Sequence, residues 1–236
     1  MLEKGSAMKK SCTAIIPFHN EKKRIFDVLT VLTKITDLSQ IVCVDDGSSD
    51  NTSQLIKKQY PDISIIRLAR NRGKSLAVAE GLNRVKTEYV FLCDADLRNL
   101  KRKEIEQAVG AILKNDRIDM MILRRTRSIF LTRLTRGDII FSGERILRKK
   151  DLMEILKMKP KKYQLEIAVN KYMIDNKKNV YWLPSSALST FKIHKVGIFM
   201  GLFNESKMIG SMFNFSGLHE YWRQVLFFCH NKHSFH

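Results

Sequence analysis

Short apolar runs alternate with stretches of helical apolar spacing through the first half of the chain, and this alternation narrows the possible folds more than any other feature. The apolar runs, which we interpret as strands, are residues 12–16, 41–44, 63–68, 89–93 and 120–123. Helical spacing occupies the intervening stretches 25–35, 51–60, 74–85 and 105–113. Strands that lack polar alternation must be buried on both faces. The pattern therefore predicts an α/β fold, with a mostly parallel sheet and helices on both of its faces.

Polar residues cluster directly after four of these strands, at residues 17–21, 45–50, 71–75 and 94–96. The carboxyl ends of parallel strands share one edge of the sheet, and ligands bind in the crevice beyond that edge. We therefore expect a single crevice at which four strand ends meet.

Two carboxylates stand two residues apart after the fourth strand, in Asp94-Ala95-Asp96. Neighbouring carboxylates beside an apolar core repel each other and are costly unless they are neutralised. Mg²⁺ or Mn²⁺ would remove that cost, because these ions accept a few carboxylate ligands and complete their shell with substrate phosphates. A pair of solvated turn acids is the alternative interpretation of this motif taken alone.

The second acidic cluster is Asp45-Asp46-Gly47-Ser48-Ser49-Asp50. A carboxylate at the end of a strand can accept hydrogen bonds from a ribose hydroxyl or a base N–H. The alternative is a turn followed by a helix N-cap, which is the role we expect for Asp50.

The segment Asn71-Arg72-Gly73-Lys74-Ser75 resembles the end of a phosphate-binding P-loop, but Leu68 stands where that motif requires its first glycine. What remains is a cationic loop entering a helix N-terminus, which is a favourable place for a phosphate. No Gly-x-Gly-x-x-Gly follows the first strand, which argues against a nicotinamide dinucleotide fold.

The chain is strongly basic, with 42 Lys and Arg against 24 Asp and Glu. Residues 98–178 hold 22 of the basic and 10 of the acidic residues, so most of the excess lies in the middle of the chain. Such an excess favours a polyanion, an anionic bilayer or a phosphorylated substrate as partner. A non-catalytic module that binds nucleic acid is one alternative, but no recognised nucleic-acid motif is present and we expect no nucleic-acid partner.

The order and spacing of Pro17-Phe18-His19-Asn20-Glu21, then residues 44–50, 71–74 and 94–96, resemble glycosyltransferase family 2. The resemblance covers roughly residues 12–125 and implies the GT-A fold, which is a nucleotide-sugar-binding α/β domain. A nucleotidyltransferase is disfavoured, because its glycine-rich loop would stand where residues 17–21 stand.

A second resemblance follows at Ser142-Gly143-Glu144-Arg145, which is similar to the Ser-Gly-x-Arg of polyprenyl-phosphate sugar transferases. Gln164-Leu165-Glu166 is similar to the glutamate-bearing helix that follows that motif. The residue between glycine and arginine is an acid here, where an aromatic residue is common.

These resemblances imply a role for each matched residue. The nucleotide-sugar would be bound by Pro17, Asn20, Glu21, Asp45, Asp46, Lys74, Asp94 and Ala95. The metal would be bound by Asp94 and Asp96. The acceptor phosphate would be bound by Ser142 and Arg145 together with Arg124, Arg125 or Arg127. The residues implied in catalysis are Asp96, Glu144, Arg145 and Glu166.

The implied reaction is a metal-dependent, inverting transfer of a sugar from a UDP- or GDP-sugar to polyprenyl phosphate, with Mg²⁺ or Mn²⁺ as the cofactor. A phosphate acceptor is already ionised and needs no general base. If the acceptor is instead a saccharide or another hydroxyl compound, a carboxylate must take the proton, and Glu144, Asp138 and Glu166 are the candidates.

We expect residues 11–191 to form the catalytic domain and residues 192–236 a C-terminal amphipathic, aromatic segment that lies in a membrane interface. The segment 1–10 has no apolar stretch of the kind a secretory signal needs, and we expect a flexible N-terminus or an expression remnant there. No apolar run reaches the roughly 18 residues of a spanning helix. The four cysteines lack metal-binding spacing, which predicts reduced thiols in a cytoplasmic protein held at the cytoplasmic face of an anionic membrane.

Overall fold

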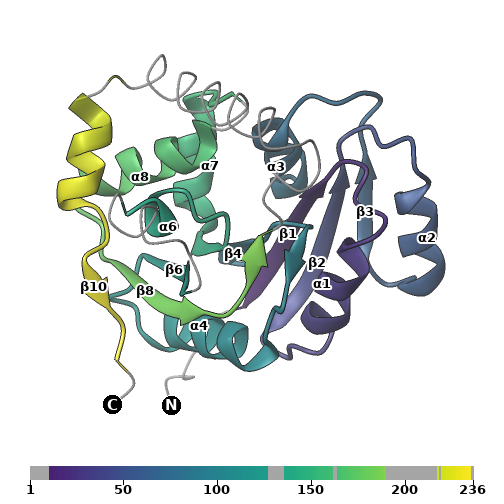
Figure 1. Cartoon of the computed structure of the whole chain (residues 1–236), viewed down its shortest axis with the longest axis horizontal. Coiled ribbons are helices and arrows are strands. Elements are labelled where there is room, and N and C mark those ends of the chain that lie inside the picture. Colours follow the sequence, from purple (N-terminus) through teal and green to yellow (C-terminus); the bar gives the residue numbers. More distant parts are fainter. Residues whose placement is uncertain (1–10, 127–135, 162–163, 190–216, 218, 235–236) are drawn as a thin grey trace, which may run out of the picture.

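The fold is built on one twisted eight-stranded sheet, seen in a computed structural model that describes residues 11–126, 136–161, 164–189, 217 and 219–234 (Figure 1). In spatial order the strands are β10 (Asn231–Lys232), β8 (Val180–Ser185), β6 (Met120–Arg125), β7 (Arg145–Arg148), β4 (Tyr89–Leu92), β1 (Cys12–Phe18), β2 (Leu38–Asp45) and β3 (Ser64–Arg67). Neighbouring strands are parallel except at β7, which is antiparallel to both β4 and β6. The predicted mostly parallel sheet is therefore confirmed.

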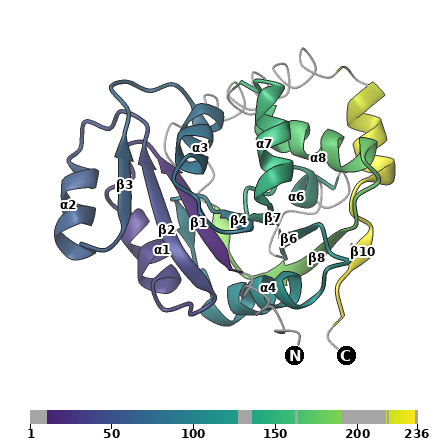
Figure 2. The same ribbon diagram turned by 180° about the vertical axis from the view of Figure 1, so that it is seen from behind.

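Helices cover both faces of this sheet, as the two opposite views show (Figures 1 and 2). One face packs against α1 (Ile25–Leu32), α2 (Thr52–Gln59) and α4 (Arg102–Lys114). The other face packs against α3 (Lys74–Leu82), α6 (Gly137–Ile140), α7 (Lys149–Lys157) and α8 (Leu165–Asp175). The short strands β5 (Leu97–Arg98) and β9 (Leu188–Ser189) form a separate antiparallel pair.

Two hydrophobic cores result, one on each side of the sheet. Ala14 and Ile16 of β1 belong to the first core, whereas Ile15 between them belongs to the second, because successive strand side chains point to opposite faces. Each fully buried Ile or Leu side chain contributes about 1.5–3 kcal/mol relative to exposure. This two-sided burial explains why the strands are continuous apolar runs in the sequence.

Helix α3 lies close against the sheet because small residues line its inner side. A Cβ at the buried Gly81 would approach the Ile15 side chain to 2.8 Å. The close packing fixes the first residue of the helix, Lys74, beside the edge at which β1, β2, β4 and β6 end. We call this edge the carboxyl edge.

Strand β1 extends two residues beyond its expected end, through Pro17 to Phe18, with Pro17 paired to Val44 of β2. Proline interrupts a central strand because it has no N–H to donate. Here the neighbour on the other side, β4, has its last paired residue opposite Ile15, and the Cys93 N–H donates to the Ile15 carbonyl at 3.1 Å. Pro17 therefore lies beyond the end of β4, where no donor is needed.

The C-terminal part of the chain differs from the expected separate segment beginning at residue 192. Residues 219–227 are helical, and β10 pairs with β8 as the outermost strand of the main sheet. Gln224 is fully buried and donates to the Ile167 carbonyl of α8 at 3.2 Å. Residues 219–234 thus pack as part of the domain, while the expected segments 1–10 and 190–216 lie outside the described residues.

No helix in the described ranges is long and apolar enough to cross a bilayer. All four cysteines are buried and free, which agrees with the predicted reduced thiols.

Candidate active site

Three charged residues meet at the carboxyl edge because of the direction of β7. Asp94 follows β4, and Arg125 is the last residue of β6. Strand β7 runs antiparallel between these two strands, so it begins at the edge where they end. Glu144, which immediately precedes β7, is thereby placed between Asp94 and Arg125.

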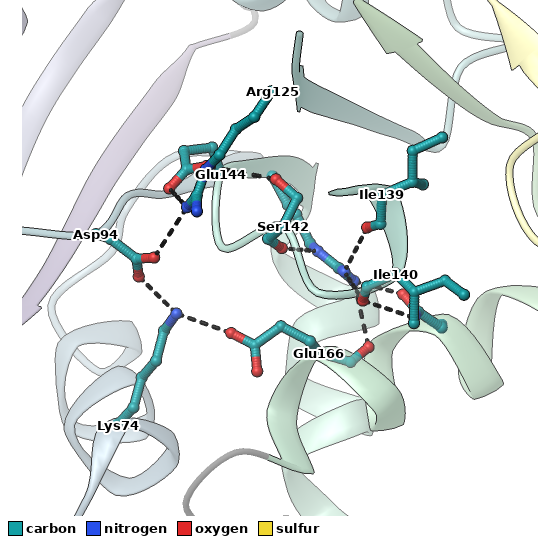
Figure 3. A network of polar contacts seen from close by, with 10 residues as sticks. Lys74, Asp94, Arg125, Ile139, Ile140, Ser142, Glu144 and Glu166 are labelled. Atoms are coloured by element: carbon teal, nitrogen blue, oxygen red, sulfur yellow. Dashed lines mark hydrogen bonds and ion pairs between the residues drawn. The ribbon is translucent and has the colours of Figure 1, made fainter. Parts of the chain in front are cut away.

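Arg125 joins the two carboxylates (Figure 3). Its guanidinium donates to Glu144 from Nε at 3.1 Å and from Nη2 at 2.9 Å, and Nη2 lies 3.6 Å from Asp94 Oδ2. Burial alone would lower the pKa of Arg125. The carboxylate of Glu144, with smaller effects from Asp94 and Asp96, outweighs burial and raises that pKa. Burial raises the pKa of Glu144, and Arg125 offsets part of this effect.

Lys74 joins Asp94 to the opposite wall of the site. Its Nζ donates to Asp94 Oδ1 at 2.6 Å and to Glu166 Oε1 at 2.8 Å, and Glu166 lies in the first turn of α8. Burial would raise the pKa of Asp94, but Lys74 and then Arg125 outweigh it, so the pKa is lowered. Burial would lower the pKa of Lys74, and the two carboxylates raise it instead. Both groups are therefore ionised at neutral pH.

Asp94 and Asp96, in the turn after β4, are both half-buried and both interact electrostatically with Arg125, while Ala95 between them belongs to the core. Among the described side chains of this cluster, four carboxylates (Asp94, Asp96, Glu144 and Glu166) interact with three cations (Lys74, Arg125 and the buried Arg145). One negative charge is formally in excess, which favours a bound cation.

The donor chemistry also fits Mg²⁺ or Mn²⁺, because Asp94 and Asp96 offer only oxygen ligands. No group of three or more His, Cys, Asp or Glu side chains is arranged around a common ion position within the part of the chain that the structure describes. That is compatible with an ion that takes the rest of its shell from substrate phosphates and water.

Gly143 is required for this arrangement. A Cβ at this position would lie closer than 3.0 Å to three atoms of the Asp94 carboxyl group. Since that carboxylate is held by Lys74, any larger residue at position 143 would push it out of place. This contact explains why the second residue of the Ser-Gly-Glu-Arg segment is a glycine.

Asp45 and Asp46 do not face an open crevice as expected. Asp45 is 1% exposed, and its two oxygens accept hydrogen bonds from the Ser48 N–H at 2.7 Å and from the Ser53 hydroxyl. Asp46 accepts from the N–H groups of Arg72 and Gly73, both at 2.7 Å. Backbone N–H groups in the turns after β2 and β3 need hydrogen-bond acceptors, and the carboxylates of Asp45 and Asp46 are those acceptors. Their position fixes the loops of the carboxyl edge.

The residues after β1 form another part of this edge. Asn20 has a left-handed backbone, with φ of 55°, and its Oδ1 accepts from the Ser49 N–H at 2.9 Å. Glu21 forms an ion pair with Arg24 at 3.2 Å. Asp50 accepts from the N–H and hydroxyl of Thr52, the first residue of α2, but the N-cap position itself is occupied by Asn51.

The position of Arg145 does not agree with its predicted role as a ligand of the acceptor phosphate. It is 1% exposed and donates to the carbonyls of Ser142 (2.7 Å), Glu166 (3.2 Å), Ile139 (3.3 Å) and Ile140 (2.7 Å), and to Asn170 Oδ1 (2.6 Å). Adjacent residues at a strand point to opposite faces, so Arg145 enters the core when Glu144 faces the site. Burial lowers the pKa of Arg145 to about 10.

Ser142 is likewise buried, and its hydroxyl donates to the Leu123 carbonyl at 2.9 Å. Arg124 points away from Arg125, pairs with the buried Asp138 at 2.6 Å and stacks over the Trp182 ring at 4.7 Å. Of the predicted acceptor group, Ser142, Arg145 and Arg124 are engaged elsewhere, Arg125 lies beside Asp94 and Glu144, and Arg127 lies outside the described residues.

The structure thus brings together Lys74, Asp94, Arg125, Glu144 and Glu166. Sequence reasoning missed Asn170 as the partner of Arg145 and Trp182 as the platform beneath Arg124. Asn170 had one usable signal, because it is an amide directly after the apolar stretch Ile167–Val169 of α8.

Comparison with known proteins identifies the family of this chain. The model of the family described as glycosyl transferase family 2 matches residues 13–181. A dolichyl-phosphate beta-glucosyltransferase of Saccharomyces cerevisiae is 35% identical over 115 residues, which are 43% of this chain and 34% of the relative. A poly-beta-1,6-N-acetyl-D-glucosamine synthase of Staphylococcus aureus is 32% identical over 120 residues, which are 45% of this chain and 28% of the relative. The chain thus matches only about a third or less of the length of these relatives.

Solved structures show the same fold. The glucosyl-3-phosphoglycerate synthase of Mycobacterium tuberculosis, in complex with phosphoglyceric acid, superimposes with a TM-score of 0.68 at 17% identity, over 88% of this chain and 80% of the other. The same enzyme with Mn²⁺, UDP and phosphoglyceric acid gives a TM-score of 0.66 at 17% identity, over 87% and 78%. The expected GT-A fold is thereby confirmed. Because the family model matches well over half of the chain, this protein belongs to glycosyl transferase family 2.

Proposed function

We propose that this protein transfers a sugar from a UDP- or GDP-sugar to polyprenyl phosphate, with Mg²⁺ or Mn²⁺ held by Asp94 and Asp96. The observation that carries the proposal is the cluster of Asp94, Lys74, Arg125, Glu144 and Glu166 at the carboxyl edge of a family 2 domain. The similarity to a dolichyl-phosphate beta-glucosyltransferase supports the lipid phosphate as acceptor.

On the donor side, the metal would supply Lewis-acid stabilisation of the leaving diphosphate when bound. The chain itself contributes the ammonium of Lys74 at the start of α3, where helix N–H groups also favour a phosphate. The loops fixed by Asp45 and Asp46 border the same edge and supply backbone groups for the nucleoside.

If the acceptor is a hydroxyl, the structure favours one of the three candidate general bases. Both Glu144 oxygens are held by Arg125 and the residue is 1% exposed, and Asp138 is paired with Arg124. The Glu166 side chain is 13% exposed, and in the described ion pairs its carboxylate contacts only the flexible ammonium end of Lys74. A saccharide acceptor is therefore the second candidate, with Glu166 as general base, and the similarity to a polysaccharide synthase favours it.

The test is transfer of radiolabelled sugar from UDP-glucose and GDP-mannose to a short-chain polyprenyl phosphate with Mn²⁺. We expect a lipid-linked product that EDTA abolishes. Glu166→Gln should retain this activity within about tenfold, because an ionised phosphate needs no base. Transfer to a soluble sugar alone, and its loss in Glu166→Gln, would replace the lipid phosphate by the hydroxyl acceptor.

We also propose that the helix at residues 219–227 rests on an anionic membrane at its cytoplasmic face. Trp222, Leu226 and Phe227 are 58%, 59% and 69% exposed; Trp222 and Leu226 stand one turn apart on the same side of that helix, and Phe227 is its last residue. An apolar helix side on a basic protein is the arrangement that binds an interface.

Changing Trp222, Leu226 and Phe227 together to serine is expected to reduce flotation with phosphatidylglycerol vesicles at least tenfold. The matched control changes Met153 and Met158 to serine, since these apolar side chains are also exposed but lie at α7. Raising the salt to 1 M should weaken binding of the wild type as well, because the Debye length falls to about 3 Å. Wild-type protein that stays with the soluble fraction at low salt contradicts the membrane proposal.

A further inference from the structure

Asp94 is paired with two cations of this chain. Its Oδ1 accepts from Lys74 Nζ at 2.6 Å, and its Oδ2 lies 3.6 Å from Arg125 Nη2. A divalent ion that binds Asp94 must therefore approach a carboxylate beside two positive charges. The two contacts compete with the ion for the Asp94 oxygens.

Of these two cations, Lys74 can move away from Asp94 more readily than Arg125. Arg125 is anchored by three hydrogen bonds to the buried Glu144, at 2.9–3.1 Å. Lys74 is held by one bond to Asp94 and one to Glu166, its side chain is 27% exposed, and its ammonium sits on four flexible methylenes. Rotation of that chain frees Asp94 without disturbing the sheet.

We propose that Lys74 is an internal counter-ion that occupies Asp94 until a divalent cation arrives together with a nucleoside diphosphate. The inference rests on the proposed function and adds a binding order to it. The metal alone binds poorly, because it must displace an ammonium and gives that ammonium no new partner. The metal with a diphosphate binds well, because the released Lys74 then pairs with the phosphates.

The consequence is a coupling between metal and diphosphate that depends on the charge of Lys74. Coupling between two ligands is reciprocal, so it can be measured on either of them. Lys74→Gln should bind Mn²⁺ alone at least about tenfold tighter than wild type, the size expected when one charge-assisted hydrogen bond no longer competes. The tightening of Mn²⁺ binding by UDP or GDP should shrink by at least the same factor.

The experiment measures free Mn²⁺ by electron paramagnetic resonance, with and without UDP or GDP, and needs no enzymatic activity. Lys74→Arg keeps the charge and should behave as wild type within about threefold. Lys86→Gln removes the same charge from an exposed position just beyond the other end of α3 and should also behave as wild type. Thermal unfolding gives a second readout, because Mn²⁺ alone should raise the melting temperature of Lys74→Gln and of Lys74→Met more than that of wild type.

The experiment distinguishes failure of the counter-ion inference from failure of the proposed metal-dependent function. If wild type binds Mn²⁺ with the diphosphate but Lys74→Gln binds Mn²⁺ alone no tighter, the counter-ion inference is wrong and the metal site stands. If Lys74→Arg tightens metal binding as much as Lys74→Gln, loss of local packing and not of charge is the cause, and the inference is again wrong. If wild type binds no Mn²⁺ with either diphosphate, both the inference and the proposed metal-dependent function fall.

Discussion

Asp96→Asn is expected to weaken Mn²⁺-dependent binding of UDP or GDP by at least about 100-fold while leaving the fold intact. The substitution removes one of the two half-buried carboxylates in the turn after β4. An amide is neutral and cannot replace a charged oxygen ligand at a divalent ion. Because the cluster carries formally excess negative charge, the free energy of unfolding should change by less than about 1 kcal/mol.

Titration calorimetry in Mn²⁺ and in EDTA measures this effect. Asp62→Asn is the matched control, because it makes the same chemical change at an exposed residue between α2 and β3. Wild type and control should lose most of their affinity for the diphosphate in EDTA, whereas Asp96→Asn should already be weak in Mn²⁺. Equal affinity of wild type with and without EDTA would contradict a metal at this site.

Arg145→Lys is expected to lower the free energy of unfolding by about 3–5 kcal/mol, although it keeps the charge. The guanidinium of Arg145 donates to five acceptors, in α6, at Ser142 and in α8, and four of these contacts are buried. An ammonium has only three donors, so at least two of these acceptors lose their hydrogen bonds. Each buried acceptor left without a partner costs about 1–3 kcal/mol.

Urea denaturation checks this value, with Arg148→Lys as control. Arg148 ends the same strand, but its partners, the Glu88 carboxylate and the Asp116 carbonyl, are in exposed contacts, so the control should lose less than about 1 kcal/mol. An Arg145→Lys protein that unfolds at the wild-type urea concentration, and instead shows a raised KM for polyprenyl phosphate, would restore the acceptor-site interpretation of Arg145.

The amino-acid sequence by itself determined the α/β architecture and the edge that carries the chemistry. Strands buried on both faces need continuous apolar runs, and helices beside them need apolar residues at a period near 3.6, so both leave local patterns. The acidic clusters after the strands at 41–44 and 89–93 were placed correctly at the carboxyl edge, because parallel strands end on the same side. The start of α2 at Thr52, held by Asp50, followed from side-chain to backbone hydrogen bonding that is local as well.

The tertiary structure alone decided which charges face each other. Glu144 meets Arg125 and Asp94 only because β7 enters the sheet antiparallel between β4 and β6, and no local pattern encodes that position. The same strand direction sends Arg145 into the core, and the pairing of β10 with β8 joins the end of the chain to the sheet. Partners far apart in sequence, such as Lys74 and Glu166, are chosen by the packing of α3 and α8 against one sheet face, which a local sequence period cannot specify.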